Sequence, residues 1–205
     1  MKVFGIGLSR SGSMALNTAL KILGYRSLFV LGYKHAEKNL LKYDAFTHVP
    51  LATMYRELDL RFPDSKFILN VRDQESWLQS CEKWWAVTES ARKKGVGREI
   101  PLRTYGTDRF DRKIFREVYD RHLNDVTQHF ASCEHALLIL DICGGEGFEK
   151  LCPFLGKPIP TQPFPNENSA SATFERRFYM LKRFVAQHTK AREVKRFLMR
   201  GLGRY

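Results

Sequence analysis

The sequence predicts an α/β protein in which a parallel β-sheet is flanked by helices on both faces. Two observations lead to this prediction. Short strand-like runs alternate with helix-period segments along the chain, and most of these runs are continuously apolar. Continuously apolar strands are typical of parallel sheets, because helices cover both faces of such a sheet.

The predicted strands are short runs rich in Phe, Ile, Leu and Val, bounded by residues that favour turns. They are residues 2–8, 28–31, 45–47, 67–71 and 136–140. The first is followed by a turn rich in Gly and Ser, and the fourth is followed by Arg72-Asp73.

The predicted helices have apolar residues at intervals of three or four positions. They are residues 12–23, 35–42, 51–61, 73–84, 111–130, 148–155 and 174–202. The first stops at Gly24, a common residue at helix C-termini. Two segments punctuated by Gly and Pro, 93–107 and 156–168, are predicted to be loops.

The composition predicts one folded domain spanning residues 1–205. Hydrophobic residues make up 43% of the chain and charged residues 27%, which excludes a mainly disordered chain or a coiled coil. No apolar run approaches the ~20 residues of a membrane span, and Arg10 comes too early for a signal peptide. The cysteines lack metal-ligand spacing, so we expect reduced thiols, no bound metal and a cytoplasmic location. They are Cys81, Cys133, Cys143 and Cys152.

The charge is unevenly distributed. The whole chain carries a net charge of +12, and residues 175–205 hold ten Lys or Arg and two acids, which gives +8. This balance predicts an anionic partner but does not identify it. The basic helical segment 174–205 is either a helix packed on the sheet with its cations in water or an amphipathic helix on a membrane surface.

Ligands of parallel sheets bind beyond the carboxyl ends of the strands, so the strand ends are the places to look for chemistry. After the first strand, residues 7–13 (Gly-Leu-Ser-Arg-Ser-Gly-Ser) form a glycine-rich turn that opens a helix. Backbone N–H groups in such a turn bind anions. The spacing from Gly7 to Gly12 fits a nucleotide-phosphate loop, but Ser13 replaces the usual Lys and a cation stands earlier, at Arg10. We call residues 7–13 the phosphate loop.

Two further strand ends carry reactive or anion-binding side chains. Arg72 follows the strand 67–71, and Ser80 lies two helical turns beyond it, so a guanidinium and a hydroxyl could bind one phosphate. The alternative is that Arg72 pairs with Asp73 or Glu75. His48 follows the strand 45–47 and precedes Pro50, where it is either a general base or a structural histidine.

Together these three elements resemble the sulfotransferases that use 3′-phosphoadenosine-5′-phosphosulfate (PAPS). The Arg10-Ser11-Gly12-Ser13-Met14 segment is similar to the family's loop for the 5′-phosphosulfate. The Thr47-His48-Val49-Pro50 segment is similar to the family's Thr-His-Leu-Pro, and Arg72 with Ser80 matches its 3′-phosphate pair. Residues 2–168 resemble a compact bacterial-type subgroup, which implies a fold like that of the P-loop nucleoside triphosphate hydrolases.

The resemblance implies sulfuryl transfer from PAPS to a hydroxyl or amine acceptor, leaving adenosine 3′,5′-bisphosphate (PAP). His48 would be the general base, and Arg10 would stabilise charge on the leaving oxygen. The donor would be bound by Arg10, Ser11, Gly12, Ser13, Met14, Arg72 and Ser80. The acceptor would be a small molecule or a glycan, and Tyr55 or Trp84-Trp85 could line its site.

The sequence departs from the better-known cytosolic sulfotransferases at several positions. Phe46 stands where they have a Lys two residues before the histidine, and Ala15 stands where they have an adenine-stacking Trp. Phe174 is a candidate replacement platform for adenine.

Two other classes of function fit parts of the sequence. A P-loop kinase would share the first strand, loop and helix, but the Walker Lys is missing. A nucleic-acid or anion-binding module could use the basic tail, but the sequence has no recognisable nucleic-acid-binding motif, so we expect no nucleic-acid partner.

Overall fold

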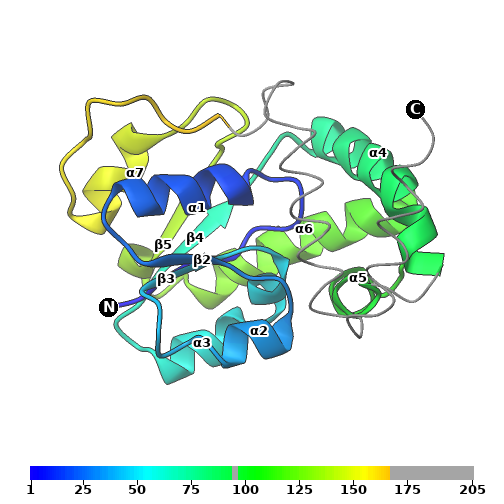
Figure 1. Cartoon of the computed structure of the whole chain (residues 1–205), viewed down its shortest axis with the longest axis horizontal. Helices are drawn as coiled ribbons and strands as arrows, with labels where there is room; N and C mark the ends of the chain where they lie inside the picture. The colour runs from blue at the N-terminus through cyan, green and yellow to red at the C-terminus, as the bar shows by residue number, and fades with distance from the viewer. Residues whose placement is uncertain (94–96, 167–205) are drawn as a thin grey trace, which may run out of the picture.

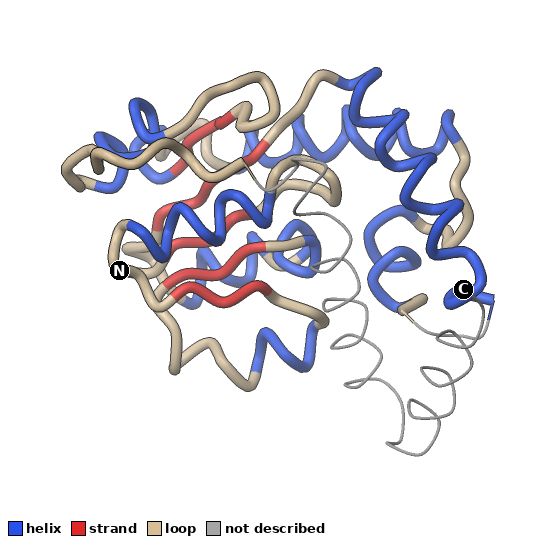
Figure 2. The backbone as a smooth tube through the Cα atoms, turned by 45° about the horizontal axis from the view of Figure 1, so that its top comes forward, coloured by secondary structure: helices blue, strands red, loops and turns tan. Residues whose placement is uncertain are grey.

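The computed structural model describes residues 1–93 and 97–166, which form a parallel five-stranded sheet with helices on both faces (Figure 1). The strand order is β2-β3-β1-β4-β5, and all neighbouring strands are parallel. Figure 2 shows the strands side by side, with helices around them. The strands are β1 (Val3–Gly5), β2 (Ser27–Phe29), β3 (Ala45–Thr47), β4 (Lys66–Asn70) and β5 (Leu137–Leu140). The predicted fold class is confirmed.

Except for α5, the helices follow the predicted order. They are α1 (Ser13–Ile22), α2 (Tyr33–Glu37), α3 (Tyr55–Arg61), α4 (Gln74–Lys93), α5 (Glu99–Tyr105), α6 (Arg112–His129) and α7 (Phe148–Leu155). Short 3-10 helices precede α3 (η1, Val49–Thr53) and β5 (η2, Glu134–Ala136). The predicted helix at 174–202, Phe174 and the predicted membrane contact lie outside the described residues.

Two hydrophobic layers sandwich the sheet. Val3, Ala45 and Ile68 point to one face, where they pack with apolar residues of α1 and α7. Phe4, Phe46 and other alternate strand residues point to the opposite face and pack with α2, α3 and α6. Figure 1 shows α1 and α7 on one side of the sheet and α2 and α3 on the other. Continuously apolar strands are therefore explained by burial on both faces.

A third cluster of buried side chains lies beside the sheet, among α4, α5 and α6. Its members include Trp77, Cys81, Trp85, Tyr105 and Phe115. The prediction of a loop over 93–107 is wrong for residues 99–105, which form α5. The helix buries Ile100, Thr104 and Tyr105, and Gly106 ends it with a left-handed backbone. Packing against η1 and α6 stabilises this helix. The local Gly and Pro content, on which the loop prediction is based, carries no information about such long-range contacts.

The topology directs attention to the ends of β1 and β4. The chain leaves β1 toward β2 on one side, whereas it leaves β4 toward β5 on the other. Adjacent parallel strands whose connections diverge leave a crevice at their carboxyl ends, where ligands of such folds bind. The phosphate loop and Arg72 follow these two strands.

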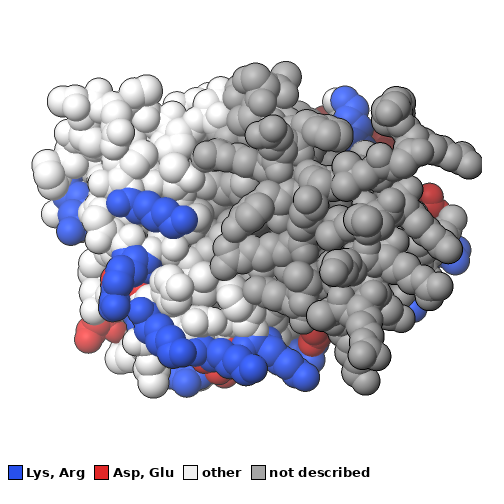
Figure 3. All heavy atoms as spheres, in the orientation of Figure 1, with Lys and Arg blue, Asp and Glu red and all other residues white. Residues whose placement is uncertain are grey.

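Charge is dispersed over the body of the molecule. On the face shown in Figure 3, Lys and Arg side chains gather along the lower edge, beside α2 and α3. Acids accompany them, because Arg61 pairs with Glu37 at 3.1 Å and Arg26 pairs with Asp44 at 2.9 Å. In the described part of the chain, no helix is long and apolar enough to cross a membrane.

Candidate active site

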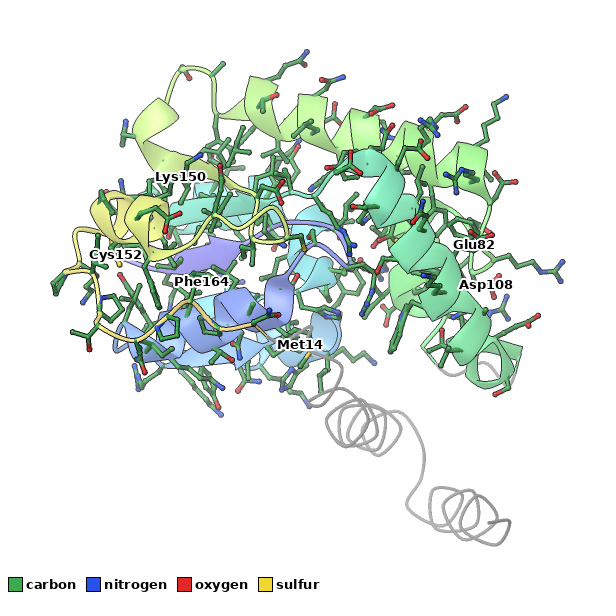
Figure 4. The ribbon with its side chains drawn as sticks, turned by 90° about the horizontal axis from the view of Figure 1, so that it is seen from above. Met14, Glu82, Asp108, Lys150, Cys152 and Phe164 are labelled. Atoms are coloured by element: carbon green, nitrogen blue, oxygen red, sulfur yellow. The ribbon has the colours of Figure 1, made fainter. Side chains whose placement is uncertain are left out.

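The phosphate loop places the start of α1 at the edge of the sheet. Gly12 caps the helix with a left-handed backbone (φ 92°), which favours glycine, and the first turn contains no acidic residue. Figure 4 shows Met14 at this end of α1. The N–H groups of the first turn have no partner within a helix, and the helix dipole adds positive potential there. The loop can therefore accept a phosphate or sulfate group.

The Ser11 side chain is turned into the loop rather than outward. Its hydroxyl donates a hydrogen bond to the Leu8 carbonyl oxygen at 2.6 Å and accepts one from the Asn70 amide, also at 2.6 Å. Ser11 is fully buried, and Ser13 is nearly so. With its hydroxyl proton engaged, the group that Ser11 can offer an anion is its backbone N–H.

Arg10 projects from the loop toward α4. Its backbone is left-handed (φ 70°), and its Nε–H donates a hydrogen bond to Ser80 Oγ at 3.0 Å. The guanidinium carbon lies 5.5 Å from the centre of the Trp84 ring. Arg10 and Ser80, two of the residues predicted to bind the nucleotide, are thus in direct contact.

Arg72 lies beside Arg10 at the end of β4. Its Nε–H donates to Ser76 Oγ at 2.9 Å, and one terminal nitrogen donates to the Arg10 carbonyl oxygen at 3.4 Å. Among the described residues Arg72 forms no ion pair with Asp73 or Glu75; Glu75 instead pairs with Arg112 and Arg116 of α6. The guanidinium groups of Arg72 and Arg10 lie near each other at this edge of the sheet, and such groups bind phosphate.

Ser76 was not predicted as a site residue. It lies four residues before Ser80 on α4, so the two hydroxyls share a helix face. The Arg72–Ser80 spacing pointed to Ser80 alone, whereas the structure pairs Arg72 with Ser76. A helical wheel of the segment after Arg72 would have shown both hydroxyls.

His48 follows β3, which is the neighbour of β1 on the side away from β4. Thr47 is in register with Gly5, so His48 and the phosphate loop leave the same edge of the sheet. Its backbone is left-handed (φ 102°), an unfavourable conformation for a non-glycine residue. The ring stacks on Phe29 with centroids 4.3 Å apart.

The hydrogen bond of the imidazole fixes its tautomer. Nδ1 lies 2.7 Å from the Val30 carbonyl oxygen, which can only accept, so Nδ1 carries the proton. In the neutral ring Nε2 then holds a lone pair. Burial lowers the pKa of His48 to about 4, although the Val30 bond acts in the opposite direction. The ring is therefore uncharged near neutral pH and able to take a proton at Nε2.

The loop after β5 is a part of the site that sequence reasoning missed. A Cβ on Gly12 would lie 3.0 Å from Ile142 Cβ, so this loop covers one side of the phosphate loop. Burial raises the pKa of the Cys143 thiol, whereas the nearby charges of Arg72 and Arg10 act to lower it. Cys143 therefore lies within electrostatic reach of both guanidinium groups.

The aromatic residues considered for an acceptor site are packed against other side chains of the protein. Tyr55 and Trp85 are buried in the hydrophobic clusters, and Trp84 lies beneath Arg10. Phe46 and Ala15, the positions that depart from cytosolic sulfotransferases, are core residues on opposite faces of the sheet. The aromatic ring in contact with His48 among the described residues is that of Phe29, which stacks on the imidazole.

Sheet topology, phosphate loop and strand-end cations define an α/β protein with a candidate anion site at the carboxyl edge of its sheet. Residues 30–173 match the family model described as "Sulfotransferase domain". This range covers most of the chain and includes His48, Arg72 and Ser80, so the chain belongs to the sulfotransferase domain family. The fold is that of the P-loop sulfotransferases, and the chain is an enzyme of the class that transfers sulfur-containing groups.

A curated relative is the Ava biosynthesis cluster protein M of Aspergillus versicolor. It is 23% identical over 212 aligned residues, which cover 81% of this chain and 80% of the relative. The kinase and the nucleic-acid module, which the sequence left open, do not agree with the family assignment.

Proposed function

We propose that this enzyme transfers the sulfuryl group of PAPS to a hydroxyl or amine acceptor by in-line displacement, with His48 as the general base. The observation that carries the proposal is the position and tautomer of His48. Its ring is neutral, its Nδ1–H is held by Val30, and it leaves the sheet edge next to the phosphate loop. A base in this state can remove a proton from an acceptor at Nε2.

The residues at the ends of β1 and β4 fit the two anionic ends of such a donor. The first turn of α1, from Gly12 to Met14, offers N–H groups to a 5′-phosphosulfate and contains no acid. Arg72 and Ser80 would bind the 3′-phosphate, with Ser76 holding the Arg72 guanidinium. Arg10 belongs to the phosphate loop, its carbonyl oxygen accepts a hydrogen bond from Arg72, and its side chain donates one to Ser80. It therefore joins the proposed position of the 5′-phosphosulfate to that of the 3′-phosphate.

Bound PAPS would supply an activated sulfuryl group, whose bond to the 5′-phosphate oxygen breaks as the acceptor oxygen or nitrogen bonds to sulfur. The loop N–H groups and Arg10 would stabilise negative charge on the leaving oxygen, as in phosphoryl transfer. His48 Nε2 would take the acceptor proton, an effect of about 10²–10⁴-fold in rate.

We further propose that the acceptor is a small molecule that approaches His48 beside Phe29. An aromatic ring next to the base offers an apolar contact for the carbon skeleton of an acceptor. The relative's name refers to a biosynthesis cluster, which places small molecules ahead of glycans in an acceptor screen.

Transfer from sulfur-labelled PAPS to a panel of phenols, alcohols and amines tests the proposal. We expect labelled product with at least one acceptor class and stoichiometric release of PAP. Under the same conditions, γ-labelled ATP should transfer no phosphate. Phosphate transfer from ATP without sulfate transfer from PAPS would refute the proposal.

A further inference from the structure

The last residue of β4, Asn70, spans the phosphate loop with its side chain. Its Oδ1 accepts a hydrogen bond from Gly7 N–H at 3.2 Å. Its Nδ2 donates to the Ser11 carbonyl oxygen at 3.0 Å and to Ser11 Oγ at 2.6 Å. One buried amide, 2% exposed, therefore joins the beginning of the loop to its middle.

The partners determine which way the amide is turned. The Gly7 N–H can only donate and the Ser11 carbonyl can only accept, so oxygen must face Gly7 and nitrogen must face Ser11. Both Nδ2 hydrogens are engaged within the loop. Asn70 is thus a support of the loop rather than a ligand of the donor.

Gly7 and Asn70 are packed too closely for a side chain on Gly7. A Cβ on Gly7 would lie 2.2 Å from the Asn70 carbonyl oxygen and 2.5 Å from its side-chain amide. The loop backbone is therefore fitted against this one residue. Two positions further on, Arg72 bonds the Arg10 carbonyl oxygen, so the end of β4 supports the loop at a second point.

We propose that Asn70 is a positioning residue that sets the spacing of the loop N–H groups and thereby the affinity for the 5′-phosphosulfate end of the donor. The inference rests on the proposed function, because it takes PAPS as the donor. It assigns to Asn70 an effect on one end of the nucleotide alone, since the 3′-phosphate is assigned to Arg72 and Ser80.

Asn70→Asp tests this role with an almost isosteric change. A carboxylate has no hydrogen for the Ser11 carbonyl, so two oxygens would face each other, and a negative charge would lie beneath the anion site. Calorimetry should show a loss of about ten- to a hundredfold in affinity for PAP. Affinity for adenosine 3′-monophosphate, which lacks the 5′ group, should stay within twofold of wild type.

Asn39→Asp is the matched control. Asn39 also donates from Nδ2 to a backbone carbonyl, that of His35 at 2.8 Å, but it lies in the turn after α2. The substitution makes the same change in charge and removes the same kind of hydrogen bond. It should leave the affinities for both nucleotides unchanged.

Thermal melting shows whether the Asn70→Asp variant is folded. If it is not, Ser11→Ala is measured in its place. This second variant removes one acceptor of the Asn70 amide, and we expect a smaller loss, still confined to PAP. Equal losses for both nucleotides, or an unchanged affinity for PAP in a folded variant, would overturn the inference. If the wild-type chain binds neither nucleotide, the proposed function fails as well.

Discussion

The two halves of the candidate site are built differently. In the proposed donor half, which comprises the phosphate loop and the end of β4, the buried Asn70 and the half-buried Arg72 bond the loop at several residues. In the proposed base half, which comprises the end of β3 and η1, His48 contacts the described residues through one hydrogen bond and one ring stack, on a left-handed backbone.

This difference indicates separate demands on the two halves. The donor would be the same nucleotide for every acceptor, and a loop that is organised before binding loses little entropy when the donor arrives. The base needs only a fixed tautomer and an accessible Nε2, and its surroundings can vary with the acceptor. Changes in the base half should therefore affect turnover, and changes in the donor half should affect nucleotide affinity.

The largest effect is expected for His48→Ala. Removing the base should lower kcat by about 10²–10⁴-fold, while the affinity for PAP stays within twofold, because the donor half does not depend on the imidazole. Rapid-quench or steady-state transfer assays give kcat, and calorimetry gives the affinity. A loss of PAP binding in this variant would mean that His48 is structural and would remove the separation of the two halves.

Arg72→Met should produce the next largest effect, in the donor half. Loss of a charge-assisted contact to the 3′-phosphate should weaken PAP binding by about ten- to a hundredfold. Binding of adenosine 5′-phosphosulfate, which lacks the 3′-phosphate, should weaken less, through the lost bond from Arg72 to the Arg10 carbonyl oxygen of the loop. Arg56→Met, at an exposed position of α3, is the control. Equal weakening of both nucleotides would show that Arg72 supports the loop instead of binding the 3′-phosphate.

Gly7→Ala should disturb the donor half through packing. The added Cβ meets the backbone oxygen of Asn70, which cannot move away without shifting β4. We expect about 1–3 kcal/mol of destabilisation in chemical denaturation, together with weaker PAP binding. Gly24, which has φ 87° and where an added Cβ would meet open space, provides the control as Gly24→Asn. Unchanged stability and affinity in Gly7→Ala would show that the loop is not tightly fitted.

The pH dependence of turnover should report the base half. His48 accepts a proton only when it is neutral, and burial lowers its pKa to about 4. The kcat/KM for PAPS, which reports the free enzyme, should therefore fall as the pH drops through that value. In the donor-bound complex, nearby negative charge favours the imidazolium and should move the acid limb of kcat to higher pH. Identical acid limbs for kcat and kcat/KM would contradict a base beside an anionic donor.

The smallest effects are expected for the two serines of α4. Ser80→Ala and Ser76→Ala should each weaken PAP binding by about two- to tenfold, the range for one hydrogen bond. Ser80 is assigned to the phosphate itself, whereas Ser76 acts through Arg72. In an Arg72→Met background, Ser76→Ala should therefore have no further effect. An additive loss in the double variant would instead assign Ser76 to the nucleotide.

Local pattern predicted much of the fold and the location of the site. The strand 45–47 was predicted at its observed bounds, and Gly7, His48 and Arg72 were predicted from glycine spacing and from polar residues at strand ends. These signals are local, because an apolar run and the residue after it are contiguous. The roles of the site residues remain predictions.

The supports of the site could not be predicted in this way. Asn70 contacts Ser11, which is 59 positions away, and Tyr119 of α6 both donates a hydrogen bond to the Arg72 carbonyl and accepts one from its N–H. Neither residue differs from an ordinary core or helix residue in the sequence. The same reason explains α5, whose Ile100 and Tyr105 are buried by elements distant in the chain.

The central claim is that the donor half recognises a 3′-phosphorylated adenine nucleotide, and a calorimetric titration of the wild-type chain tests it most directly. PAP, ATP and ADP would be titrated under identical conditions. We predict selective binding of PAP, at least about tenfold tighter than either of the others. A preference for ATP, or no binding of PAP, would contradict the assignment of Arg72 and Ser80 and the choice of PAPS as donor.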